Sequence, residues 1–128
     1  MAAGFALACQ ARAQSDLVIA LDVPAGLAPR RARARITGLA EIAPDILHLD
    51  IALAADAVPA YLAGQYMNVI LGDGVTRSFS VASAPDAGRL DFYIRRIRDG
   101  LCTDRALARM RPGEWLDVEI PLGGFCYR

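Results

Sequence analysis

Four consecutive residues, Arg77-Ser78-Phe79-Ser80, bring together a guanidinium, a phenyl ring and two hydroxyls. The Arg77 guanidinium can bind a diphosphate through paired hydrogen bonds, because its planar fork matches phosphate oxygens. The Phe79 ring can stack on a planar aromatic ligand, and the Ser80 hydroxyl can bond to a ring nitrogen of that ligand. A strand that only filled a core would have no need of an arginine and two serines. The run is therefore a candidate binding motif.

A second candidate lies downstream, where Gly100, Cys102 and Thr103 precede a helix that we expect over residues 104–110. Thr103 is placed to cap this helix, and Arg111-Pro112-Gly113 is placed to end it. Free backbone amides at a helix N-terminus, together with the Thr103 hydroxyl, form a favourable anion site. Cys102 is interpreted as a small apolar core residue; the alternative is a reactive thiol, because a helix N-terminus lowers a thiol pKa.

The elements that must position these motifs are short strands. Period-2 alternation and turn residues predict strands over 31–36, 46–53, 64–71, the Arg77 motif, 89–97 and 115–120. Gly72-Asp73-Gly74 predicts a turn into the fourth strand. Six strands with one short helix, no βαβ alternation and no G-x-G-x-x-G motif predict an all-β barrel or sandwich. On this pattern His48 is expected to face solvent, and Tyr66 and Trp115 are expected in the core.

Length and composition narrow the class of protein. The 128 residues suffice for one domain, and the net charge of zero argues against a nucleic-acid partner. No apolar run approaches the ~20 residues of a membrane helix, so no membrane partner is expected. Cys9, Cys102 and Cys126 lack metal-type spacing and indicate reduced thiols in the cytoplasm. The apolar N-terminus lacks the basic region of a signal peptide.

From about Ala32 to Arg128 the chain resembles the ferredoxin reductase type of flavin-binding domain, as found in reductase components of bacterial multicomponent oxygenases. The sharpest element of the likeness is the family's Arg-x-Tyr-Ser pattern, matched by Arg77, Phe79 and Ser80. The resemblance implies a six-stranded antiparallel Greek-key barrel that binds FAD, rather than FMN, at one side. It implies that Arg77 pairs with the diphosphate, that Phe79 stacks on the isoalloxazine, and that Ser80 bonds near the flavin N5. Phenylalanine in place of the more usual tyrosine keeps the stacking and loses a hydroxyl contact.

Two further segments carry the resemblance. Gly100 to Thr103 matches the family's segment that holds the diphosphate opposite the arginine, with a glycine, backbone amides and a Ser or Thr. Phe92-Tyr93-Ile94-Arg95 looks like the family's strand whose backbone lines the ribityl and adenosine side. The resemblance therefore implies cofactor contacts at Ile94 and Arg95 as well.

The strand that carries the first motif poses a geometric difficulty. Simple alternation puts Arg77 and Phe79 on one face and Ser80 on the other. The binding hypothesis therefore includes a bulge or bend near residues 80–83, where the strand would twist at the barrel rim.

The two ends of the chain resemble segments at domain boundaries: residues 121–128 look like the family's connection from the barrel to a nicotinamide-binding domain. Residues 1–23 look like the tail of a plant-type [2Fe-2S] ferredoxin domain, in which Cys9 matches the fourth cluster ligand. The other three ligands, a C-x4-C-x2-C run, are absent from the sequence, so no metal site is expected. Residues 24–30 predict a linker, and 31–128 the FAD-binding barrel. We expect the middle part of a three-domain reductase, whether as a gene fragment, a split gene or a deliberately shortened chain.

The function implied by the resemblance is electron transfer. It would be that of an FAD-binding module of an NAD(P)H-dependent reductase, passing electrons from a nicotinamide through flavin to an iron-sulfur centre or an oxygenase. Its partners would be nicotinamide-binding and ferredoxin domains or an oxygenase component. Reduction by NADH is expected to be poor in this chain alone, since it shows no dinucleotide-binding fingerprint, so enzymatic activity is left open. The alternative is a non-catalytic barrel that binds no flavin and acts as an interaction module.

Overall fold

The computed structural model describes residues 12–18, 20, 28–53, 59–72, 74–124 and 126–127. The predictions for Cys9, for most of the ferredoxin-like segment and for most of the linker at 24–30 lie outside these residues. Within the described part, no helix is long and apolar enough to cross a membrane.

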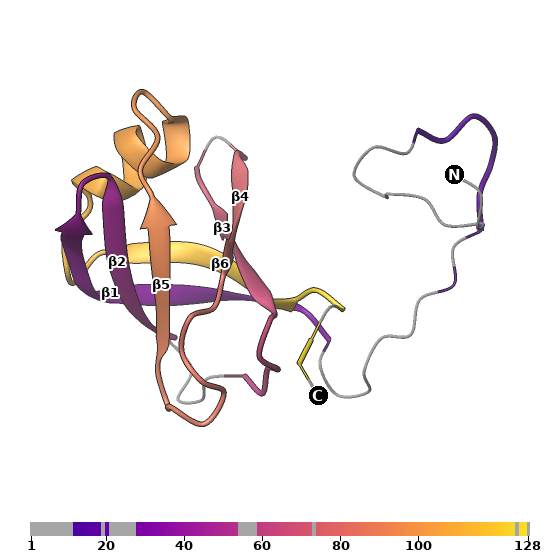
Figure 1. Cartoon of the computed structure of the whole chain (residues 1–128), viewed down its shortest axis with the longest axis horizontal. Coiled ribbons are helices and arrows are strands. Elements are labelled where there is room, and N and C mark those ends of the chain that lie inside the picture. Colours follow the sequence, from indigo (N-terminus) through magenta and orange to yellow (C-terminus); the bar gives the residue numbers. More distant parts are fainter. Residues whose placement is uncertain are drawn as a thin grey trace.

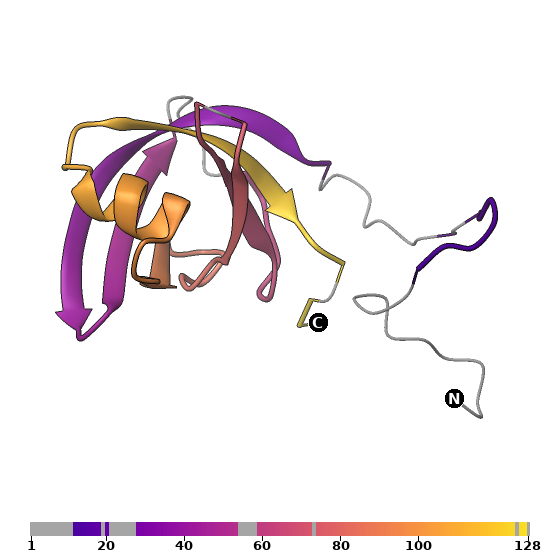
Figure 2. The same cartoon turned by 90° about the horizontal axis from the view of Figure 1, so that it is seen from above.

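Six antiparallel strands form one curled sheet with the order β4-β3-β6-β1-β2-β5. Their bounds are β1 Arg30–Ala43, β2 Ile46–Leu53, β3 Tyr66–Ile70, β4 Thr76–Ser80, β5 Leu90–Arg95 and β6 Trp115–Leu122. The curl brings the two edge strands, β4 and β5, near each other without a hydrogen-bonded ladder between them (Figures 1 and 2). The prediction of an all-β, six-stranded antiparallel barrel with one short helical segment is confirmed.

The core fills the inside of the curl, and it follows from alternation along the strands. On β2 the side chains of Leu47, Leu49 and Ile51 point inward, as predicted, because every second residue of a strand faces the same side. Phe92 on β5 and Met67 on β3 are fully buried in the same core. Truncating a buried phenylalanine to alanine typically costs about 3–5 kcal/mol of unfolding free energy, so this core holds the two edge strands in place.

A tight turn joins β3 to β4, as the glycines at 72 and 74 predict. Leu71 N donates to Val75 O at 2.9 Å and closes the turn. Gly74 has φ +82°, a left-handed conformation that glycine adopts without a steric penalty. The turn fixes the register in which Arg77 lies opposite Val69.

The helical segment begins earlier than predicted. A π-helical turn spans η1 Leu101–Ala106 and a 3-10 turn follows at η2 Leu107–Arg109. Gly100 is the residue before the helix, and its carbonyl accepts hydrogen bonds from the backbone N–H groups of Asp104 and Arg105. Thr103 is therefore not the cap: it is buried inside the first turn, where its Oγ1 accepts a hydrogen bond from Ile97 N at 3.0 Å.

The expected burial of Trp115, Tyr66 and His48 needs correction. Trp115 is 43% exposed and is not a core residue, because the neighbouring Leu116 takes the inward position on β6. Tyr66 is half-buried rather than fully in the core. His48 does lie on the outer face of β2, yet it does not simply face solvent: its ring stacks on Tyr93 with the ring centroids 4.9 Å apart.

Candidate cofactor-binding site

The predicted site residues collect around a seam, which we define as the facing free edges of β4 and β5 together with the turn at residues 100–103. Directly after β4, Val81 N donates to Gln65 O at 3.1 Å. This bond shows that Val81, and with it Phe79 and Arg77, directs its backbone groups to β3. In an antiparallel pair the backbone groups of alternate residues point toward and away from the partner strand. The backbone groups of Ser78 and Ser80 therefore point to the seam.

The same reasoning applies to β5. Arg96 N donates to Asp45 O at 2.7 Å, just beyond the end of the β2 ladder. By alternation Ile94 pairs with β2, whereas Tyr93 and Arg95 direct their backbone groups to the seam. Two strand edges thus face each other with hydrogen-bonding groups that no ladder between β4 and β5 satisfies.

Arg77 is an exposed cation of the seam. Its Nη1 donates to the carbonyl of Thr76 at 2.8 Å. Among the residues that the structure describes, no carboxylate lies within ion-pair distance of its guanidinium. Most of its hydrogen-bonding capacity is therefore free for an anionic ligand.

The turn at 100–103 contributes unused donors. The backbone N–H groups of Leu101, Cys102 and Thr103 form no hydrogen bond within the described part of the chain. Gly100 is needed for close packing, since a Cβ there would lie 2.8 Å from Ile97 O and 3.1 Å from Thr103 Oγ1. The Thr103 hydroxyl already accepts one hydrogen bond, but its own proton remains available for donation.

Electrostatics link the two halves of the seam. Cys102 is buried, and this burial raises the pKa of its thiol, while the positive charge of Arg77 lowers the pKa in part. The Arg77 guanidinium is therefore close enough to act on the first helical turn. The raised pKa keeps the thiol neutral near pH 7, which favours the interpretation of Cys102 as a small core residue over a reactive thiol.

The remaining residues of the first motif lie on two faces. Phe79 is half-buried and packs against the core from the side that it shares with Arg77. Ser80 is exposed, and its hydroxyl has no partner within the described residues. The Ser78 hydroxyl instead donates to Asn68 Oδ1 at 2.7 Å on the outer face of the barrel. Ser78 thus offers its backbone, and not its hydroxyl, to the seam.

The bend expected after β4 is present. The backbone of Val81 still bonds to β3, whereas Ala82 N donates to Asp91 O on β5 at 2.9 Å, and the chain bends at Ser83. The register between β3 and β4 is continuous, so the chain leaves β4 through a bend and not through a β-bulge. The chain crosses the seam directly after Ser80.

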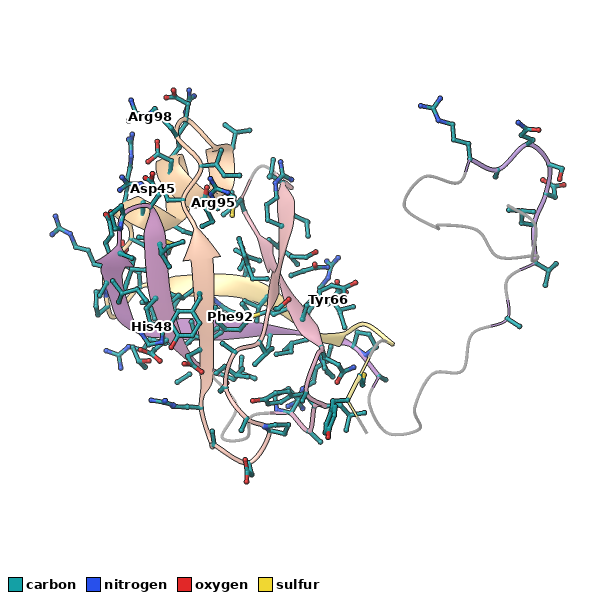
Figure 3. The ribbon with its side chains drawn as sticks, in the orientation of Figure 1. Asp45, His48, Tyr66, Phe92, Arg95 and Arg98 are labelled. Atoms are coloured by element: carbon teal, nitrogen blue, oxygen red, sulfur yellow. The ribbon has the colours of Figure 1, made fainter. Side chains whose placement is uncertain are left out.

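The two predicted positions on β5 differ in what they can offer. Arg95 is exposed at the end of β5 beside the helical turn (Figure 3), and its backbone points to the seam. Ile94 is only 1% exposed and its backbone pairs with Leu47, so it offers the seam nothing. Tyr93 belongs to the same predicted strand but is not among the predicted cofactor contacts, and it has the seam-facing backbone instead. The direction of the Tyr93 backbone follows from the hydrogen bond between Arg96 N and Asp45 O, which the sequence does not reveal.

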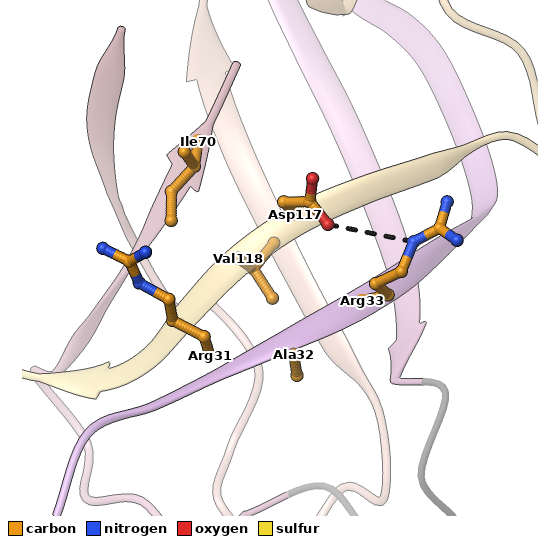
Figure 4. A pocket seen from close by; sticks show the side chains of 6 residues that line it. All are labelled: Arg31, Ala32, Arg33, Ile70, Asp117 and Val118. Atoms are coloured by element: carbon orange, nitrogen blue, oxygen red, sulfur yellow. Dashed lines mark ion pairs between the residues drawn. The ribbon is translucent and has the colours of Figure 1, made fainter. Parts of the chain in front are cut away.

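A cavity elsewhere on the barrel does not belong to the seam. It has a volume of about 460 Å³ and is lined by Arg31, Ala32, Arg33, Ile70, Asp117 and Val118 (Figure 4). Arg33 Nε and Asp117 Oδ1 in its lining lie 3.8 Å apart, and both side chains are mostly exposed. Exposed ion pairs of this kind are solvated and contribute about 0–1 kcal/mol. Since its charges are already paired, this cavity is not a candidate anion site.

The comparisons with known proteins fit this geometry. The sequence profile of the oxidoreductase FAD-binding domain family matches residues 33–127. The chain belongs to this family. The seam fits the FAD that the family name implies, because an unpaired guanidinium and three unbonded backbone N–H groups are suitable donors for a diphosphate.

Relatives of this FAD-binding domain include components of oxygenase systems. The chain is 30% identical to the toluate 1,2-dioxygenase electron transfer component of Pseudomonas putida, covering 98% of this chain and 38% of that protein. It is 33% identical to the aromatic O-demethylase reductase subunit of an Amycolatopsis species, covering 97% and 38%. The crystal structure of an Amycolatopsis cytochrome P450 reductase superposes with a TM-score of 0.73 at 28% identity, covering 80% of this chain and 31% of that one. The chain thus spans less than two fifths of these proteins.

Proposed function

We propose that this FAD-binding domain holds FAD at the seam and serves as the electron-transfer module of an NAD(P)H-dependent reductase. The electrons would pass from a nicotinamide through the flavin to an iron-sulfur centre or an oxygenase. The observation that carries the proposal is Arg77, an exposed guanidinium with no carboxylate partner in the described chain, whose charge acts on Cys102 in a helical turn with free N–H groups. The names of the relatives, an electron transfer component and a reductase subunit, support the same reading.

The residues divide the binding task by their chemistry. Arg77 and the backbone N–H groups of residues 101–103 hold the diphosphate from two sides, with the Thr103 hydroxyl as a further donor. Because the Cys102 thiol stays protonated, it adds no negative charge that would repel the phosphates. Burial of Cys102 thus keeps a negative thiolate charge away from the proposed diphosphate site.

The aromatic and polar ends of the ligand have separate supports. The exposed part of Phe79 offers a surface for stacking the isoalloxazine, and the free Ser80 hydroxyl offers a bond to its N5 edge. The seam-facing backbone groups of Tyr93 and Arg95 line the ribityl and adenosine side. When bound, FAD supplies the redox chemistry, since flavins accept a hydride and release single electrons; the protein orients it.

The wider context of this module is proposed on the same grounds. Nicotinamide-binding and ferredoxin domains, or an oxygenase component, are the proposed partners, because the relatives that share this domain are more than twice as long. Residues 1–23, with Cys9 as a fourth ligand, would then belong to a [2Fe-2S] domain of a longer parent. The proposed location of such a protein is the cytoplasm.

A comparison of three flavins tests the proposal. The two-sided diphosphate site predicts that the chain binds FAD at least tenfold more tightly than FMN, which has a single phosphate, and more tightly still than riboflavin. Quenching of flavin fluorescence on titration with protein gives the three dissociation constants. Equal affinity for all three flavins would place the phosphates away from Arg77 and residues 101–103.

A further inference from the structure

A second group of polar side chains lies on the outer face of the barrel, over β2 and β5. We call it the histidine cluster; it consists of His48, Asp50 and Asp91. Figure 3 shows His48 on β2, on the side of the barrel away from Tyr66. The cluster shares no side chain with the seam, and neither the family nor the proposed function assigns it a role.

The strand pairing brings the two carboxylates of the cluster together. Asp50 and Asp91 are direct partners in the register of β2 and β5. The bond from Arg96 N to Asp45 O sets the alternation, so this pair is a non-hydrogen-bonded one, in which opposite Cα atoms are about 4.5 Å apart and side chains are closest. Like charges directly opposite in a sheet repel and destabilise it. A cation between them would relieve this repulsion.

His48 lies beside both carboxylates. Its Nε2 is 3.1 Å from Asp91 Oδ2, and its Nδ1 is 3.7 Å from Asp50 Oδ2. One donor atom from each of the three residues lies within 4.8 Å of the other two, and stacking on Tyr93 fixes the plane of the ring. Three donors at this separation can close around a metal ion by small side-chain rotations.

Two of the four carboxylate oxygens remain unused. Asp91 Oδ1 and Asp50 Oδ1 are inaccessible to water and have no hydrogen-bond partner within the described residues. The Asp91 side chain is only 7% exposed. A buried acceptor without a partner costs about 1–3 kcal/mol, more when it is charged. Both nitrogens of the one imidazole already face the other two oxygens, so His48 alone cannot satisfy the cluster.

The backbone leaves room for one of these carboxylates. Gly38 is the register partner of Asp50 and lies at an irregularity of β1. A Cβ at Gly38 would come within 2.9 Å of Asp50 Oδ2. Any larger residue would push the carboxylate aside, so the glycine keeps a space that Asp50 occupies.

We propose that His48, Asp50 and Asp91 bind a divalent transition-metal ion, with Zn²⁺ as the probe ion. One imidazole nitrogen and two carboxylate oxygens are donors suited to Zn²⁺, Mn²⁺ or Fe²⁺, whereas Mg²⁺ and Ca²⁺ prefer oxygen ligands alone. Three protein donors leave a coordination position for water. The ion would neutralise the facing carboxylates and use the oxygens that now lack partners.

The single histidine of the sequence makes the test direct. In the 128-residue chain, titration with Zn²⁺ is followed by nitrogen-detected NMR of the imidazole. The expected result is a change of one ring nitrogen to the metal-bound shift, complete at one equivalent, with no change on adding Mg²⁺. Imidazole signals that stay constant through ten equivalents of Zn²⁺ would overturn the proposal, because they would show that His48 serves only as the counter-ion of the two aspartates.

Variants separate this site from the thiols, which also bind Zn²⁺. Asp50→Asn and Asp91→Asn are expected to weaken Zn²⁺ binding at least tenfold by calorimetry, whereas the control Asp117→Asn, an exposed aspartate on β6, leaves it unchanged. Asp50 is only part-buried, so its variant remains informative if Asp91→Asn does not fold. With Co²⁺ as a spectroscopic substitute, weak visible bands without thiolate charge transfer are expected. Thiolate bands, or full Zn²⁺ affinity in Asp50→Asn, would overturn the assignment.

Discussion

Two arginine-bearing regions of this barrel look alike in sequence and behave differently in structure. On the outer face of β1, Arg31 and Arg33 lie opposite Glu119 and Asp117 of β6, and each pair of side chains approaches to 3.8 Å. On the edge strand β4, Arg77 lies opposite the apolar Val69. Cross-strand pairing therefore satisfies the first two arginines and leaves the third without a carboxylate partner in the described chain. The partner on the next strand, rather than the residue type, distinguishes a solvated surface from an anion site.

The sharpest test of this contrast is to remove one arginine from each region. Arg77→Ala is expected to weaken FAD binding about 10–100-fold, because a charge-assisted hydrogen-bonded pair contributes about 1.5–3 kcal/mol. Arg33→Ala is the matched control and is expected to change the affinity less than twofold. Fluorescence titration gives both dissociation constants. Equal losses in the two variants would mean that only net charge matters.

The buried threonine of the seam has a structural role that the outer face lacks. Thr103→Val removes the acceptor of Ile97 N, and we expect the unfolding free energy to fall by about 1–3 kcal/mol. Thr76→Val, at an exposed position on β4, is the control and is expected to change stability by less than about 0.5 kcal/mol. Urea denaturation measures both. A stable Thr103→Val variant would show that this hydrogen bond does not hold the first helical turn.

The buried thiol beside Arg77 predicts a pH effect on stability. Because the pKa of Cys102 is raised in the folded state, its contribution is complete below the pKa of an unfolded thiol, about 8.5, and is lost as pH rises through the folded pKa. The unfolding free energy of the parent chain should therefore decline above about pH 8.5. Cys102→Ala should flatten this decline, and Cys126→Ala should not. An identical alkaline slope in all three proteins contradicts the assignment.

The smallest effect is expected on the outer face. A double-mutant cycle on Arg33 and Asp117 should give a coupling free energy below about 1 kcal/mol, because both side chains are largely solvated. Thermal unfolding at low and high salt checks the value. A coupling well above this, insensitive to salt, would show that the outer face contributes to the fold as strongly as the seam.

Much of the fold could be predicted because its strands are regular. Alternation along β2 gave both its inward face and its bounds, since every second residue must enter the core. The start of the helical segment could not be predicted in this way. Thr103 looks like a cap in sequence, but its hydroxyl serves Ile97 at the end of β5, a contact that depends on how the loop folds back. Contacts on the outer face, such as that of the Arg33 guanidinium over the Trp115 ring, cannot be predicted from the alternation of apolar and polar residues either.

The site could be predicted in part for related reasons. The roles of Arg77 and of the turn at 100–103 stay predictions, whereas on β5 the ladder geometry directs the backbone of Tyr93, and not that of Ile94, to the seam. In an antiparallel ladder the backbone groups of every second residue bond to the partner strand, and those of the residues between point to the free edge. On β5 the hydrogen bond from Arg96 N to Asp45 O fixes which residues belong to which set. Ser78 likewise turns its hydroxyl to Asn68 because of the pairing with β3. Neither the direction of the β5 backbone groups nor the partner of the Ser78 hydroxyl can be predicted from the local sequence.

The most direct measurement is the visible spectrum of the purified 128-residue chain after incubation with FAD and removal of unbound flavin. A flavin held at the seam predicts a yellow protein that absorbs near 450 nm and loses most of its bound FAD on Arg77→Ala but not on Arg33→Ala. Folded but colourless protein, even after excess FAD, would contradict the proposal that this seam binds the cofactor.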